Sequence, residues 1–135
     1  MVWRPELQQH ANGATALGAI IGVTDDPRTT AETYAGFYAQ GRIEIAEGGF
    51  RVETGQHSAD LLFLDLQATQ ALWPGQPLAK TSTNSFVGLR VRVKNSERVR
   101  EVLDRNGVRY SETAGGGIAV GTQYASGAVI EFVPA

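Results

Sequence analysis

The chain has 135 residues, of which 42% are hydrophobic and 19% are charged, a formal net charge of -2, and no cysteine. This length and composition predict one soluble globular domain rather than a disordered chain. The small negative charge, without any basic block, argues against nucleic acid or an acidic membrane surface as a partner. The lack of cysteine excludes disulfides, thiol nucleophiles and thiolate metal ligands.

Membrane insertion and secretion find no support in the sequence. No apolar run approaches the ~18 residues that a membrane-spanning helix needs. The opening stretch "MVWRPELQQH" also lacks the apolar core of a signal peptide. We therefore expect a cytoplasmic protein.

The first half of the chain reads as β-α-β-β-β. A strand is expected over 14–23, followed by a helix over about 24–41 with Asp25 or Asp26 at its N-cap and Gly41 after its end. Three short strands follow, separated by glycine-containing turns. Their expected ranges are 42–47, 49–54 and 59–66.

The second half repeats this order after an interruption. Pro74, Gly75 and Pro77 break the pattern, so that 67–84 is expected to be a linker. The later elements are a strand at 85–93, a helix from about 96, and strands at 108–112, 116–121 and 127–133. The sequence predicts a single domain, 1–135, built from module one (about 14–66), the linker and module two (about 85–134).

Three motifs carry a resemblance to a known family. They are "VTDDP" and "VKNS", each leading from a strand into a helix, and the last strand "GAVIEFV". With the paired βαβββ units, they resemble the vicinal-oxygen-chelate superfamily of glyoxalase I, extradiol dioxygenases, bleomycin and fosfomycin resistance proteins and methylmalonyl-CoA epimerase, including glyoxalase-like domains. The resemblance implies an α+β fold in which two βαβββ modules form a curled mixed sheet around a cleft, with helices on the outside. It also implies a homodimer.

The same resemblance places four metal-ligand positions at Gly18, Phe63, Gly88 and Glu131. Only Glu131 carries a donor, and a catalytic divalent ion normally needs about three protein ligands. The two histidines, His10 and His57, are expected to lie off the cleft floor. We therefore expect no metal site and no other cofactor.

Strand alternation predicts which side chains line the cleft. In 85–93, Gly88, Arg90 and Arg92 share a face, and Glu131 is expected on that face too. In module one, Gly18, Ile20 and Phe63 are expected to form an apolar wall. A register error of one residue would reverse these assignments. Trp73, in the linker, is expected either to cover the cleft as a lid or simply to pack.

The expected ligand-binding set is therefore Gly18, Ile20, Phe63, Trp73, Arg90, Arg92 and Glu131, with Glu131 the one candidate for catalysis. Arg90 or Arg92 could bind an anionic group of a ligand, although exposed arginines are common on sheets. The leading interpretation is a small-molecule-binding protein without a catalytic metal. The alternatives are a metal-dependent lyase, isomerase or dioxygenase, and a degenerate structural or regulatory domain in which Glu131 forms a structural ion pair.

Overall fold

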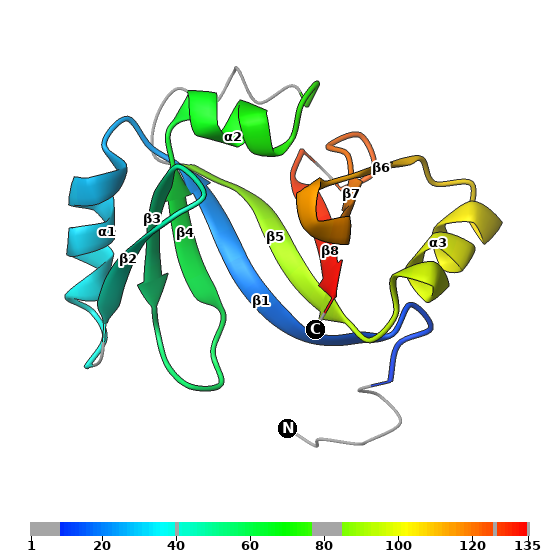
Figure 1. Ribbon diagram of the computed structural model, residues 1–135, viewed down its shortest axis with the longest axis horizontal. Coiled ribbons are helices and arrows are strands. Elements are labelled where there is room, and N and C mark those ends of the chain that lie inside the picture. The colour runs from blue at the N-terminus through cyan, green and yellow to red at the C-terminus, as the bar shows by residue number, and fades with distance from the viewer. Residues whose placement is uncertain (1–8, 40, 77–84, 126, 135) are drawn as a thin grey trace.

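A computed structural model describes residues 9–39, 41–76, 85–125 and 127–134. Within these ranges, three α-helices accompany one open mixed sheet of eight strands, in the order β2-β3-β4-β1-β5-β8-β7-β6 (Figure 1). The α+β fold predicted from the sequence is confirmed. No helix in the described ranges is long and apolar enough to cross a bilayer.

The order β-α-β-β-β occurs twice, as predicted. The first unit comprises β1 (Ala14–Val23), α1 (Pro27–Ala35), β2 (Arg42–Ala46), β3 (Gly49–Glu53) and β4 (Asp60–Leu64). Helix α2 (Leu66–Leu72) follows it. The second unit comprises β5 (Ser85–Val93), α3 (Ser96–Arg105), β6 (Tyr110–Glu112), the short 3-10 turn η2 (Ala114–Gly116), β7 (Ile118–Val120) and β8 (Val129–Pro134).

The two units join at the centre of the sheet. Strand β1 pairs antiparallel with β5, while β4 runs parallel to β1 and β8 runs parallel to β5. Helices α1 and α3 lie at opposite sides of the molecule, and α2 lies across one end of the central strands (Figure 1). The two units therefore have the same internal arrangement on either side of the β1–β5 pair.

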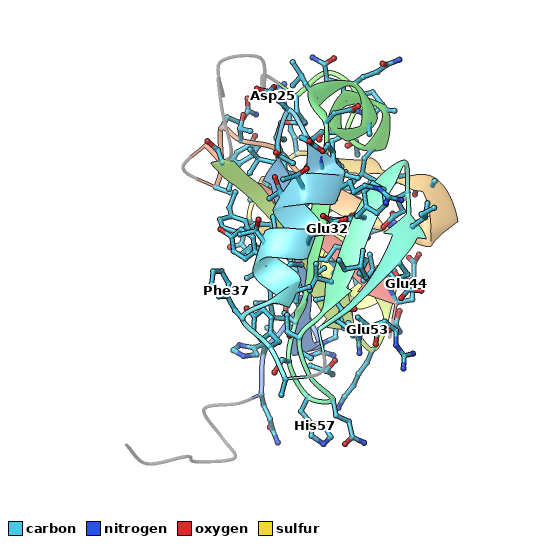
Figure 2. The ribbon with its side chains drawn as sticks, turned by 90° about the vertical axis from the view of Figure 1, so that its left-hand side faces the viewer. Asp25, Glu32, Phe37, Glu44, Glu53 and His57 are labelled. Atoms are coloured by element: carbon cyan, nitrogen blue, oxygen red, sulfur yellow. The ribbon has the colours of Figure 1, made fainter. Side chains whose placement is uncertain are left out.

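Helix α1 ends earlier than the sequence predicted. Asp26 is its N-cap and accepts a hydrogen bond from the backbone N–H of Thr29, but the helix stops at Ala35. After Ala35, the backbone N–H groups of Phe37 and Tyr38 donate to carbonyls three residues earlier rather than four. The chain is therefore wound more tightly here than in an α-helix. The ring of Phe37 is consequently 72% exposed and projects from the molecule (Figure 2).

The sheet has two differently used faces. Its outer face packs against α1 through Val52, Leu61 and Phe63, and against α3 through Val93 and Phe132. Its inner face carries Ala19, Ile21, Leu62 and Leu64, which pack with Trp73 at the end of α2. The inner face is the one on which the sequence predicts the cleft.

Candidate functional site on the inner face of the sheet

Arg90 and Glu131 form the centre of the inner face. Strands β5 and β8 place the two residues side by side, and Arg90 Nε donates to Glu131 Oε1 at 2.7 Å. The Glu131 side chain is 2% exposed and that of Arg90 is 13% exposed. The prediction that Glu131 shares a face with Arg90 is confirmed.

A third residue, Glu47, completes this group and was not anticipated from the sequence. It lies in the two-residue turn between β2 and β3. Both terminal nitrogens of Arg90 donate to its carboxylate, at 2.6 and 2.7 Å. Arg51 lies 3.8 Å from the same carboxylate. The guanidinium of Arg90 is thus held on one edge by a buried carboxylate and on the other by a carboxylate that is 34% exposed.

The charges in this group stabilise one another. Burial alone would lower the pKa of Arg90, but hydrogen bonds to Glu47 and Glu131 outweigh it and raise that pKa. The hydrogen bonds from Arg90 also lower the pKa of Glu47, against the opposing effect of burial. Arg90 and Glu47 therefore stabilise each other's charged forms, as expected of charge-assisted hydrogen bonds.

The apolar wall from module one is made of other residues than predicted. Ile20 and Phe63 lie on the outer face, where they belong to the cluster against α1, and Phe63 packs on Tyr34 with ring centroids 4.9 Å apart. A register shift in β1 between Leu17 and Ala19 changes the alternation after Gly18. In β4, Phe63 alternates with Leu62 and Leu64, which belong to the inner-face cluster. Ile20 and Phe63 therefore lie on the face opposite Glu131, contrary to the prediction. Ala19, Ile21 and Leu62 stand on the inner face instead.

Gly18 and Arg92 border a cavity of about 170 Å³ on the inner face. A β-carbon at position 18 would lie 3.2 Å from Cγ of Arg92, so glycine leaves this arginine room. Arg51 and Arg90 also line the cavity. Arg92 is exposed, and within the described part of the chain no carboxylate oxygen lies within 4.0 Å of its guanidinium nitrogens. It is the arginine of this cavity that is most available to an anion.

Asp60, another residue not anticipated, connects this cavity to a larger groove. The groove, of about 390 Å³, shares Asp60 and Arg92 with the cavity and extends to His57. His57 is exposed at the tip of the turn that connects β3 to β4 (Figure 2). Burial raises the pKa of Asp60, although Arg51 and Arg92 act in the opposite direction. The inner face is thus open and polar beside Arg92.

Trp73 closes the other end of the inner face. Its side chain is 2% exposed and contributes to the core cluster with Ile21 and Leu62. The indole lies directly on Gly88, where an added β-carbon would come within 2.7 Å of Trp73 Cζ3 and 2.9 Å of the Val129 carbonyl oxygen. Of the two expected roles of Trp73, packing is the one that its burial supports.

A further cavity of about 360 Å³ lies between the turn after α2 and the β6–β7 edge. Its lining includes Gly75, Arg109, Ser111 and Thr122. The backbone N–H of Thr122 donates to Gln76 Oε1 at 3.2 Å, which ties the β7–β8 connection to the segment after α2. No residue predicted from the sequence as part of the site lines this cavity, so it provides an internal comparison for binding experiments.

The residues on the inner face do not fit a divalent metal ion. Gly18 and Gly88 have no donor side chain, Phe63 faces the helix side, and Glu131 is engaged by Arg90. The space above Gly88 is filled by the Trp73 indole. Among the described residues, no three histidine or carboxylate side chains are grouped in a way that could hold an ion. A positively charged guanidinium at the centre also disfavours a second cation there.

Comparison of the whole fold with solved structures gives consistent matches. Methylmalonyl-CoA epimerase from Mycobacterium tuberculosis superposes with a TM-score of 0.67 at 17% identity, over 93% of this chain and 91% of the epimerase chain. A Streptomyces coelicolor methylmalonyl-CoA epimerase variant in complex with 2-nitronate-propionyl-CoA gives 0.61 at 14% identity, over 90% and 98%. The hypothetical protein BH1468 from Bacillus halodurans C-125 gives 0.62 at 16% identity, over 88% and 93%.

The chain has the vicinal-oxygen-chelate fold. The resemblance noted in the sequence motifs is confirmed at the level of the fold. No protein-family model and no curated protein matches the sequence. At these low identities the matches establish the vicinal-oxygen-chelate fold. They do not assign the reactions or ligands of the matched proteins to this chain.

Proposed function

We propose that the protein binds a small organic anion on the inner face of its sheet and does so without a catalytic metal. The observation that carries this proposal is the 170 Å³ cavity, in which Arg51, Arg90 and Arg92 converge. Arginine guanidinium groups bind carboxylates and phosphates through paired hydrogen bonds. The matched epimerase in complex with 2-nitronate-propionyl-CoA supports a small-molecule ligand for this fold.

The proposed site combines one anion anchor with an apolar wall. Arg92 offers an exposed guanidinium, and Ala19 and Leu62 line the same cavity. Gly18 keeps the approach to Arg92 open because any side chain there would touch it. Such a mixture of apolar surface and a few directed polar groups is typical of small-molecule sites.

A titration of succinate and inorganic phosphate, followed by calorimetry, tests this proposal. We expect Arg92→Gln to weaken binding about tenfold, because a hydrogen-bonded charge is lost. The matched control is Arg109→Gln, which removes the same charge from the separate 360 Å³ cavity and should leave the affinity unchanged. Equal effects of the two substitutions would show that only overall charge matters and would contradict the proposed site.

The absence of a catalytic metal is tested separately. The protein purified from rich medium is expected to contain no stoichiometric zinc, nickel, iron or manganese, since Gly18, Gly88 and Phe63 supply no donor to the inner face. Elemental analysis gives the metal content, and a melting curve with added ions gives any stabilisation. An ion that raises the melting temperature of the wild type, but not of Glu131→Gln, would favour the metal-dependent lyase, isomerase or dioxygenase alternative.

A purely structural or regulatory role is the second candidate, because the Arg90–Glu131 pair is already complete without a ligand. A melting-temperature screen in which no small acid shifts the transition would favour it over binding. A homodimer and a cytoplasmic location stay predictions from the sequence.

A further inference from the structure

Glu47 stands at a backbone position that does not suit it. Ala46 pairs with Gly49 across the β2–β3 hairpin, leaving Glu47 and Gly48 as a two-residue turn with φ values of 52° and 85°. Such a turn requires positive φ at both residues and strongly favours asparagine followed by glycine. Glu47 is the one non-glycine residue with positive φ in the described part of the chain. A glutamate at a backbone position that disfavours it indicates that its side chain makes a contact needed elsewhere in the fold.

The role is visible in what the carboxylate contacts. Glu47 occupies both terminal nitrogens of Arg90 in the paired geometry that a bound carboxylate or phosphate would adopt. The remaining nitrogen, Nε, belongs to the buried Glu131. Arg90 thus has one permanent partner within the sheet and one partner that comes from an exposed turn and is itself 34% exposed.

The two arginines that contact Glu47 both belong to the proposed binding cavity. Arg90 and Arg51 line it together with Arg92. Since Arg90 and Arg92 are two residues apart on one face of β5, their backbone positions are separated by roughly 6 to 7 Å. Two anionic groups on one short molecule could therefore engage both arginines if Glu47 gave way.

We infer that Glu47 is an internal competitor that occupies the Arg90 half of a dianion-binding site, and that the ligand is a short dicarboxylate or a phosphorylated acid. This inference rests on the proposed function of the inner face. One anionic group of the ligand binds Arg92, the other replaces Glu47 on Arg90, and the β2–β3 turn moves its carboxylate into solvent. The pair of arginines selects dianions over monoanions of the same length.

Glu44 provides a matched control within the same hairpin. It lies on β2, is exposed (Figure 2), and its carboxylate approaches Arg51 at 3.7 Å. In the described part of the chain, Glu44 forms no hydrogen bond or ion pair with Arg90. Glu44→Gln therefore removes one negative charge from the same hairpin, while Glu47 keeps its hydrogen bonds to both terminal nitrogens of Arg90.

The test compares succinate with butyrate, which has the same length and one carboxylate, by calorimetric titration. We expect Glu47→Gln to bind succinate about tenfold more tightly than the wild type, while Glu44→Gln changes the affinity by about twofold at most. Butyrate should gain less than succinate from Glu47→Gln. A second variant, Glu47→Asn, suits the turn and is too short to replace the carboxylate on Arg90, so it should behave like Glu47→Gln.

Each pattern of results decides the inference. If both Glu47 variants bind succinate with wild-type affinity while Arg92→Gln weakens it, the competitor role is wrong and the proposed binding site stands. If Arg92→Gln is also without effect, or if no variant binds either succinate or inorganic phosphate, both proposals are overturned. Faster amide hydrogen exchange over 44–51 in the wild type on adding succinate would support release of the turn.

Discussion

Arg90→Met is expected to lower the free energy of unfolding by about 3–5 kcal/mol. The substitution leaves Glu131, which is 2% exposed, as a buried carboxylate without its arginine, and it also releases the carboxylate of Glu47. Methionine retains much of the volume of the arginine stem, so that lost packing contributes little. Urea unfolding of the wild type and the variant at neutral pH measures the difference.

The control for this prediction is Arg92→Met on the same face of β5. Because no carboxylate of the described residues pairs with Arg92, its loss should change the free energy of unfolding by less than about 1 kcal/mol. Similar losses of unfolding free energy in the two variants would indicate that the Arg90–Glu131 pair stabilises the fold no more than an exposed arginine does. The description of Arg90 and Glu131 as the electrostatic centre of the inner face would then be wrong.

Trp73→Ala is expected to cost about 3–5 kcal/mol of unfolding free energy. The indole is 2% exposed and fills the space over Gly88 that Ile21 and Leu62 enclose, so alanine leaves a large cavity between α2 and the sheet. Thermal and urea unfolding would both report the loss.

Trp73→Phe separates packing from hydrogen bonding. The buried Nε1 of Trp73 has no acceptor among the described residues, so phenylalanine gives up no hydrogen bond and keeps most of the apolar volume. We expect a loss below about 2 kcal/mol for this variant. If Trp73→Phe proved as destabilising as Trp73→Ala, an unrecognised acceptor for the indole N–H would be the better explanation.

The sequence predicted the module repeat and one half of the site for clear physical reasons. Strand alternation in 85–93 is regular through Gly88, Arg90 and Arg92, so the pairing of β5 with β8 places Glu131 next to Arg90 as expected. In β1 the register shift near Gly18 breaks the two-residue period, so that Ile20 lies on the outer face. In β4, Leu62 and Leu64 face inward, so Phe63 between them faces outward. A bulge of this kind leaves no reliable mark in a single sequence beyond the glycine itself.

The participation of Glu47 depends on tertiary structure. It is distant in sequence from Arg90 and meets it only because the β2–β3 turn reaches over the inner face. The local signal was the stretch "EGG" between two alternating strands, in which glutamate replaces the asparagine that such a turn favours. Asp60 likewise reads as an ordinary strand end, and only the adjoining cavities show its position beside Arg92.

An NMR titration of EDTA-treated protein with succinate tests the central claim most directly. If the inner face binds small anions without a metal, the largest chemical-shift changes should occur at the amides of Gly18 and Arg92 and at the side-chain Nε of Arg92. The amides of Gly121 and Thr122, which border the separate 360 Å³ cavity, should shift least. Changes centred on Gly121 and Thr122, or changes at Gly18 and Arg92 that appear only after a divalent metal is added, would contradict the account.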